Sequence, residues 1–102
     1  MKKTIAVFLR PGSQWNPDKP VREQAYWDEH ARFMDALFDA GTILLGGPFA
    51  DGSGSMVILE AENVEAAEAI FQDDPWTQQD VLVASEAREW TIYLDARVEA
   101  GR

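Results

Sequence analysis

HARFMDALFDAGTILLGGPF, residues 30–49, carries the clearest signal of the fold in this chain. The stretch continues an amphipathic helix, stops at Gly41 and resumes as an apolar strand. At about 100° per residue, the apolar side chains of this helix fill an arc of roughly 140°, with charged residues opposite. His30, the only histidine, falls near the middle of the apolar arc. A buried imidazole needs partners for its ring nitrogens, so another part of the chain must meet it.

Composition restricts the partners and the chemistry. A chain of 102 residues is one small domain with a modest core. Its formal net charge of -9 repels phosphate backbones and anionic lipids, so we expect neither nucleic acid nor membrane as a partner. The chain has no cysteine and one histidine, and no calcium-loop spacing. We therefore expect no disulfide, no metal and no cofactor.

The N-terminus gives no targeting signal. Lys2 and Lys3 precede only a short run of strand-like character at 4–9, which is too short for a signal peptide, and no apolar run reaches membrane-spanning length. The expected location is cytoplasmic.

The pattern of apolar residues predicts four strands and two helices. In chain order these are a strand at 4–9, a helix from about 18–20 to 41, strands at 42–45 and 55–60, a helix from 63 to 73–75, and a strand at 81–93. Asn63 is a good N-cap for the second helix, and the Asp-Pro step at 74–75 ends it. Residues 46–48 are expected to break the second strand.

The order βαββαβ predicts an α+β, ferredoxin-like fold, in which an antiparallel sheet carries both helices on one face. Residues 1–95 form the domain, and 96–102 read as a frayed tail. The uncovered face remains apolar, because it carries one of two alternating sets of strand residues: Val7, Leu9, Val57, Leu59 and Leu82, or their alternates. A second subunit packed sheet to sheet would bury that face, so we expect a homodimer.

Residues 11–20, PGSQWNPDKP, contain three of the five prolines and predict a loop. Trp15 in its middle is unusual for a plain connector. The loop is either a connector or a flap over a site.

Several short motifs, taken in order, resemble the YCII (YciI-like) family of the dimeric α+β barrel superfamily. They are His30 seven residues before Leu37, GTILLGGPF at 41–49, Asp51-Gly52, MVILEA at 56–61, NVEAA at 63–67, DDPW at 73–76, and Glu89-Trp90. The resemblance covers about residues 1–95. The loop at 11–24, with Trp15, is longer than usual in that family.

The resemblance implies a small homodimer whose cleft holds a histidine and an aspartate as a catalytic pair. Matched by motif, these are His30 and Asp74, with the adjacent Asp73 as the alternative partner. It also implies lyase, isomerase or dehydrohalogenase chemistry on small, often cyclic compounds.

Each half of the pair also has a purely structural interpretation. A lone histidine on an apolar helix face is by default a core residue with a backbone or carboxylate partner. As a site residue, a partly buried imidazole bonded to a carboxylate can move one proton to or from a ligand. Asp74 either ends the helix before proline or orients the imidazole.

The candidate ligand-binding residues lie in the first hairpin and after the second helix. Gly46, Gly47 and Pro48 either end a strand or let a ligand lie against the backbone. Ser55 adds a hydroxyl, but no nucleophile elbow supports a nucleophilic serine at Ser53 or Ser55. Pro75 and Trp76 complete the set, since a flat indole suits a cyclic ligand.

These residues favour a cofactor-free enzyme that transfers a proton in an aromatic-lined cleft, with a lyase or isomerase as the best fit. The alternative is a non-catalytic module that binds a small ligand, in which His30 and Asp74 are structural. A third hypothesis is that the protein is an oxygen-dependent monooxygenase, like some relatives with this fold. The enzyme and the non-catalytic module are distinguished by whether the His30–Asp74 pair faces an open cavity or is enclosed in the packed core.

Overall fold

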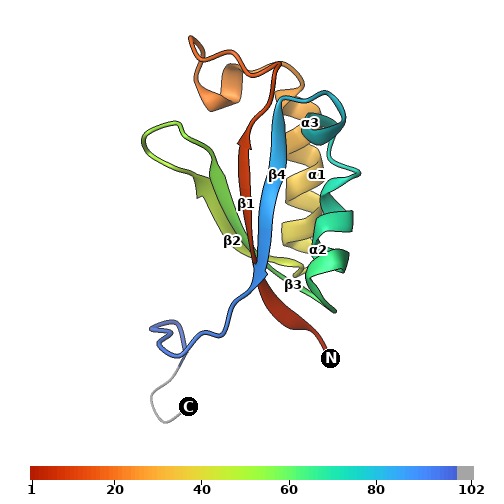
Figure 1. The fold of residues 1–102 in the computed structure, drawn as a ribbon, viewed down its shortest axis with the longest axis vertical. Helices are drawn as coiled ribbons and strands as arrows, with labels where there is room; N and C mark the ends of the chain where they lie inside the picture. The colour runs from red at the N-terminus through yellow and green to blue at the C-terminus, as the bar shows by residue number, and fades with distance from the viewer. Residues whose placement is uncertain (99–102) are drawn as a thin grey trace.

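The structure, a computed structural model, describes residues 1–98 as four strands and four helical segments. In chain order they are β1 (Lys3–Pro11), the 3-10 helix η1 (Val21–Glu23), α1 (Trp27–Asp39), β2 (Ile43–Pro48), β3 (Ser55–Ala61), α2 (Val64–Phe71), α3 (Pro75–Gln78) and β4 (Leu82–Glu89). The strands form one sheet in the order β2-β3-β1-β4, and all neighbours are antiparallel. The helices α1, α2 and α3 lie on one face of it (Figure 1). This confirms the predicted ferredoxin-like α+β fold.

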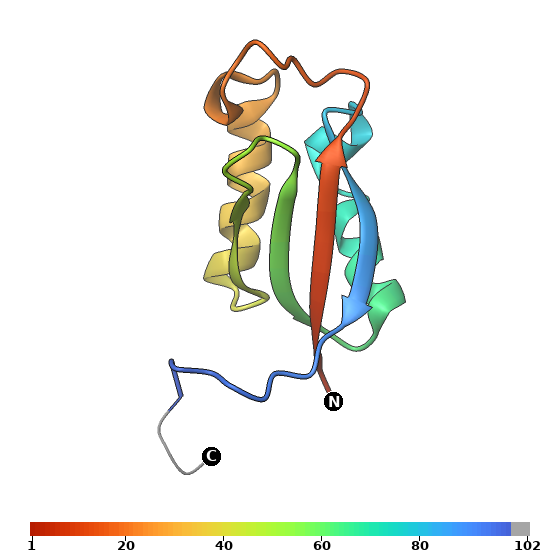
Figure 2. The same ribbon diagram turned by 60° about the vertical axis from the view of Figure 1, so that its left-hand side comes forward.

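The core lies between the sheet and the helices. Side chains alternate along a strand, so every second residue of β1 and β3 points to the helices. These are Ile5, Val7 and Leu9 with Val57, Leu59 and Ala61, and they join Phe71 and Trp76 in one buried cluster. In Figure 2, α1 lies beside β2, and α2 lies beside β4.

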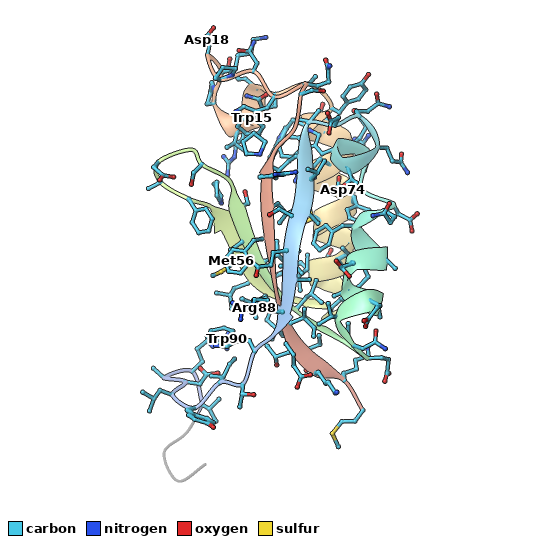
Figure 3. All side chains as sticks on the ribbon, viewed as in Figure 1. Trp15, Asp18, Met56, Asp74, Arg88 and Trp90 are labelled. Carbon is cyan, nitrogen blue, oxygen red and sulfur yellow. The ribbon has the colours of Figure 1, made fainter. Side chains whose placement is uncertain are left out.

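The other face of the sheet carries the alternate residues, and they are apolar in the middle. Ala6 pairs with Ile58, and Phe8 pairs with Met56. Together with Arg88, Glu89 and Trp90 these residues line a hollow of about 330 Å³. Figure 3 shows Met56, Arg88 and Trp90 on the side away from the helices. No helix of the described residues covers this face.

The first helix begins later than the sequence predicted. Pro20 and Gln24 have extended backbone, and Tyr26 adopts a left-handed conformation with φ of 63°. The segment 18–26 is therefore a single 3-10 turn followed by a break, because the Gln24 side chain turns inward to bond the loop. Tyr26, directly before α1, is 48% exposed, whereas His30 is buried in α1.

Two strand boundaries also differ from the prediction. Gly46, Gly47 and Pro48 do not break β2 but pair with β3. β2 is an edge strand, where glycine and proline are tolerated since one side needs no ladder bonds. β4 ends at Glu89, so Trp90 to Tyr93 lie outside the sheet.

The second helical region follows the prediction more closely. The Asn63 side chain caps α2 by accepting from the Ala66 N–H at 2.8 Å, and α2 ends at Phe71. The short helix α3 after Asp74 was not predicted. Of the expected tail 96–102, residues 99–102 lie outside the described part of the chain.

Candidate functional site

His30 meets Asp74 in the interior of the fold. His30 Nδ1 lies 2.9 Å from Oδ1 and 3.0 Å from Oδ2 of the Asp74 carboxylate. Asp74 is 0% exposed and His30 is 7% exposed. The neighbouring Asp73 is exposed, so the aspartate that meets the imidazole is Asp74.

The local sequence places the Asp74 carboxylate. Asp74 is the N-cap of α3, and its Oδ1 accepts from the Trp76 backbone N–H at 2.9 Å. Pro75 at the first helical position keeps Asp74 extended, as a residue before proline prefers. The carboxylate thus accepts from two N–H groups. We therefore assign the ring proton of His30 to Nδ1, the nitrogen that faces this acceptor.

The second ring nitrogen of His30, Nε2, is the reactive one in this tautomer. In the neutral ring it carries the lone pair. Nε2 makes no hydrogen bond within residues 1–98. In the same residues, Thr77 Oγ1 is the fully buried side-chain N or O atom that lacks a partner, so Nε2, which also lacks one, is not fully buried. The His30 ring lines a cavity of about 240 Å³. The pair therefore combines a buried anion with an accessible base.

The cavity lies between α1, the β2–β3 hairpin and α3, and its walls are mostly apolar. Besides His30 it is lined by Leu9, Val21, Trp27, Met34, Gly46, Gly47, Pro48, Ser55, Val57, Trp76 and Leu82. His30 is the one ionisable side chain among these lining residues. The Ser55 hydroxyl is the other polar group that suits a small ligand.

Aromatic contacts fix the plane of the imidazole. The Trp76 ring stacks on His30, with centroids 3.8 Å apart and an interplanar angle of 8°. Trp76 is itself held by its Nε1–H, which donates to the Ala25 carbonyl at 2.7 Å. Trp27 lies 5.8 Å from His30 between ring centroids. His30 is thus positioned by a carboxylate at its edge and an indole on its face.

The structure brings most of the predicted site residues together. His30, Gly46, Gly47, Pro48, Ser55 and Trp76 line the cavity, and Asp74 lies behind His30. Pro75 starts α3 and is not among the lining residues. Trp27 and Met34 were missed, although they precede and follow His30 by three and four residues, the spacing of one helix face.

Within residues 1–98 no three acidic or histidine side chains gather closely enough to hold a metal ion. In the same part of the chain, no helix is both long and apolar enough to cross a membrane.

The fold and the site define a class: a small α+β domain with a buried histidine–aspartate pair on the wall of an apolar cavity. The chain belongs to the YCII-related domain family, whose model matches residues 10–91. It is 36% identical to the uncharacterized protein YjpA of Bacillus subtilis (strain 168) over 63 residues, which are 62% of this chain and 67% of YjpA.

Among solved structures, the chain is similar to TftG from Burkholderia phenoliruptrix AC1100. TftG is a 5-chloro-2-hydroxyhydroquinone dehydrochlorinase, seen in complex with 2,5-dihydroxybenzoquinone. The TM-score is 0.58 at 22% identity, and the match covers 86% of this chain and 93% of TftG. At this identity the likeness shows a shared fold.

Proposed function

We propose that this protein is a small-molecule enzyme in which His30, oriented by Asp74, transfers a proton to or from a ring compound. The reaction is of the lyase, isomerase or dehydrohalogenase type. One observation carries the proposal: an accessible Nε2 on a cavity wall, backed by a buried carboxylate at 2.9 Å from Nδ1.

The proton step follows from the tautomer. The Nε2 lone pair takes a proton from a C–H or O–H of the substrate, and the electron pair left behind either shifts within the ring system or expels a leaving group. The ring then carries a positive charge between the Asp74 carboxylate and the face of Trp76, and both stabilise it. Return of the proton from Nε2 to the product or the leaving group restores the enzyme.

The cavity selects for an uncharged substrate. No lysine or arginine is among its lining residues, so a carboxylate or phosphate would be buried without a partner. A volume of about 240 Å³ lies below the usual range of roughly 300–1,000 Å³ for drug-sized ligands. Both features favour a neutral, single-ring compound against Trp27 and Trp76. The quinone bound by TftG is likewise a single-ring compound, and the name of TftG supports elimination chemistry.

Gly47 supports contact between the ligand and the backbone. A Cβ placed at Gly47 would meet nothing within 4 Å, so packing does not require glycine there. Glycine in a strand weakens it. Its presence beside the cavity is explained if the ring of the substrate lies against the backbone at this point.

We further propose that the enzyme is a homodimer joined through the open face of the sheet. Phe8, Met56 and Trp90 line the hollow of about 330 Å³ there, and Trp90 is 46% exposed. An apolar sheet face of this kind is favourable when a second sheet packs on it.

The function is tested by a screen of neutral hydroxylated and halogenated hydroquinones, followed by ultraviolet absorbance. We expect turnover by the wild type and a loss of about 10²–10⁴ in His30→Gln, the usual contribution of a general base. Glu29→Gln, exposed on the same helix, is the control and should retain activity. Undiminished turnover in His30→Gln would contradict the proposal, while ring-compound binding without turnover in the wild type would favour the ligand-binding module.

A further inference from the structure

Trp15 lies on a loop that the rest of the fold holds in place at two points. The first is Asp80, just before β4. Its carboxylate accepts from the Ser13 hydroxyl at 2.5 Å and the Ser13 backbone N–H at 2.9 Å. These two bonds hold the pKa of Asp80 below its ordinary value, and the bond from the Ser13 hydroxyl has the larger effect. The Gln14 N–H also donates to the Asp80 carbonyl at 2.9 Å.

The second anchor is Gln24, whose side chain is buried inside the loop. Its Oε1 accepts from the Asn16 N–H at 2.8 Å. Its amide nitrogen donates to the carbonyls of Asn16 at 2.7 Å and Lys19 at 2.9 Å. Gln24 is 4% exposed, so these bonds are shielded from water. Trp15 sits directly between the two anchors.

The Trp15 ring lies next to the His30 cavity, although it is not itself among the residues that line that cavity. It meets Trp76 edge to face, with centroids 6.0 Å apart and an interplanar angle of 82°. A second void of about 20 Å³ lies against Trp15. This void shares five lining residues with the main cavity, namely Val21, Pro48, Ser55, Trp76 and Leu82. Figure 3 places Trp15 at the end of the sheet where β1 finishes. The void has room for about one water molecule, so little space separates the shared wall of the cavity from the indole.

We infer that Trp15 is a specificity-determining residue that limits the length of the ligand in the His30 cavity. The inference rests on the proposed function. Removing the indole would join the two voids and add space on the order of 150 Å³, the size that truncation of a large apolar side chain leaves. A ligand with a second ring would then fit where the wild type accepts one ring.

The anchors explain why the indole acts as a wall. A side chain on an unattached loop would move aside for a longer ligand, with little loss of affinity. Trp15 is held by bonds on both sides of it in sequence, from Ser13 and Gln14 to Asp80 and from Asn16 to Gln24. Movement of the loop that carries the indole therefore requires the loss of these hydrogen bonds, of which those of Gln24 are shielded from water.

The test compares two neutral probes that differ only in length, phenol and 4-phenylphenol. Their dissociation constants are measured by NMR on the ring protons of His30, the single imidazole, in the wild type, Trp15→Ala and Trp15→Leu. We expect the wild type to prefer phenol. In Trp15→Ala the preference should fall by about tenfold or more, since a few methylene-sized groups are worth that much in a pocket. Trp15→Leu should give a smaller fall. Phe38→Ala, which removes an aromatic ring 59% exposed on α1, is the control and should keep the wild-type ratio.

An unchanged ratio in a folded Trp15→Ala or Trp15→Leu protein would overturn the role of Trp15 while leaving the proposed function intact. Unfolding of both variants would overturn it as well, because Trp15 would then be a residue that the fold itself requires. A wild type that binds neither probe would contradict the proposed ring-compound site as a whole.

Discussion

The substitution Asp74→Asn removes the negative charge beside His30 while keeping a side chain of nearly the same shape. Asparagine is as good an N-cap as aspartate, so α3 should keep its first hydrogen bond. The amide has one acceptor oxygen, however, where the carboxylate accepts from both His30 Nδ1 and the Trp76 N–H. If the oxygen takes the place of Oδ1 and keeps the Trp76 N–H, the NH₂ group takes the place of Oδ2, which lies 3.0 Å from Nδ1. Two N–H donors would then meet, and we expect His30 to relieve this by accepting at Nδ1 and carrying its proton on Nε2, where it can no longer act as a base.

The expected losses differ in size for activity and stability. A wrong tautomer caused by this same exchange lowers kcat by about 10⁴ in serine proteases, and we expect a loss of that order here. For stability, a hydrogen bond to a charged group, worth about 1.5–3 kcal/mol, is replaced by a neutral one worth about 1 kcal/mol. The free energy of unfolding should fall by about 1–2 kcal/mol, which lowers Tm by about 4–16 °C for a chain of this size.

The assay needs no substrate, because His30 is the only histidine. ¹⁵N NMR of the imidazole at about pH 9, where neutral imidazole is the usual form, distinguishes the two tautomers. We expect the Nδ1–H form in the wild type and the Nε2–H form in Asp74→Asn. Asp73→Asn, one residue away and exposed, is the matched control and should look like the wild type. The same tautomer in the wild type and Asp74→Asn would refute the reasoning.

Two further predictions concern stability and assembly. The pKa of Asp80 is lowered from 3.8 in the folded protein, so its carboxylate stabilises the fold above that pH and the contribution is lost as the pH falls through the folded value. The wild type should therefore be more stable to urea than Asp80→Asn at neutral pH, and the two stabilities should converge as the pH falls below 3.8; an equal gap at neutral and at acidic pH would contradict this. Asparagine tolerates the left-handed backbone of Asp80 and so leaves the turn unchanged. Light scattering should give twice the chain mass of 11.4 kDa for the wild type and the single mass for Met56→Glu, which places a charge on the open sheet face; a monomeric wild type would rule out the dimer.

The fold could be predicted because local patterns agreed with the tertiary structure. Alternating apolar residues in β1 and β3 and the Asn63 cap needed no knowledge of distant contacts. The start of α1 could not be predicted in this way. The Gln24 side chain bonds Asn16 and Lys19, and this tertiary arrangement overrides a helical pattern that begins near Pro20.

The site was only partly predictable for a similar reason. His30 and Asp74 are separated by 44 residues, and the residues alone left the partner of His30 open. The family resemblance supplied Asp74. Trp27 could have been found from helical spacing, but the wall formed by Trp15 depends on Asp80, which no local pattern connects to the loop.

Because Asp74 makes hydrogen bonds to both His30 and Trp76, its presence in a relative of this protein has two possible explanations. The carboxylate caps α3 through Trp76 and also holds His30, so the fold benefits from an aspartate before this proline independently of any chemistry. A relative that has lost its chemistry would still benefit from the cap. The histidine has no such second duty in α1, where many apolar residues would fill its place. In a comparison of sequences, a histidine at position 30 is therefore the better sign of retained activity, whereas an aspartate at position 74 is not by itself such a sign.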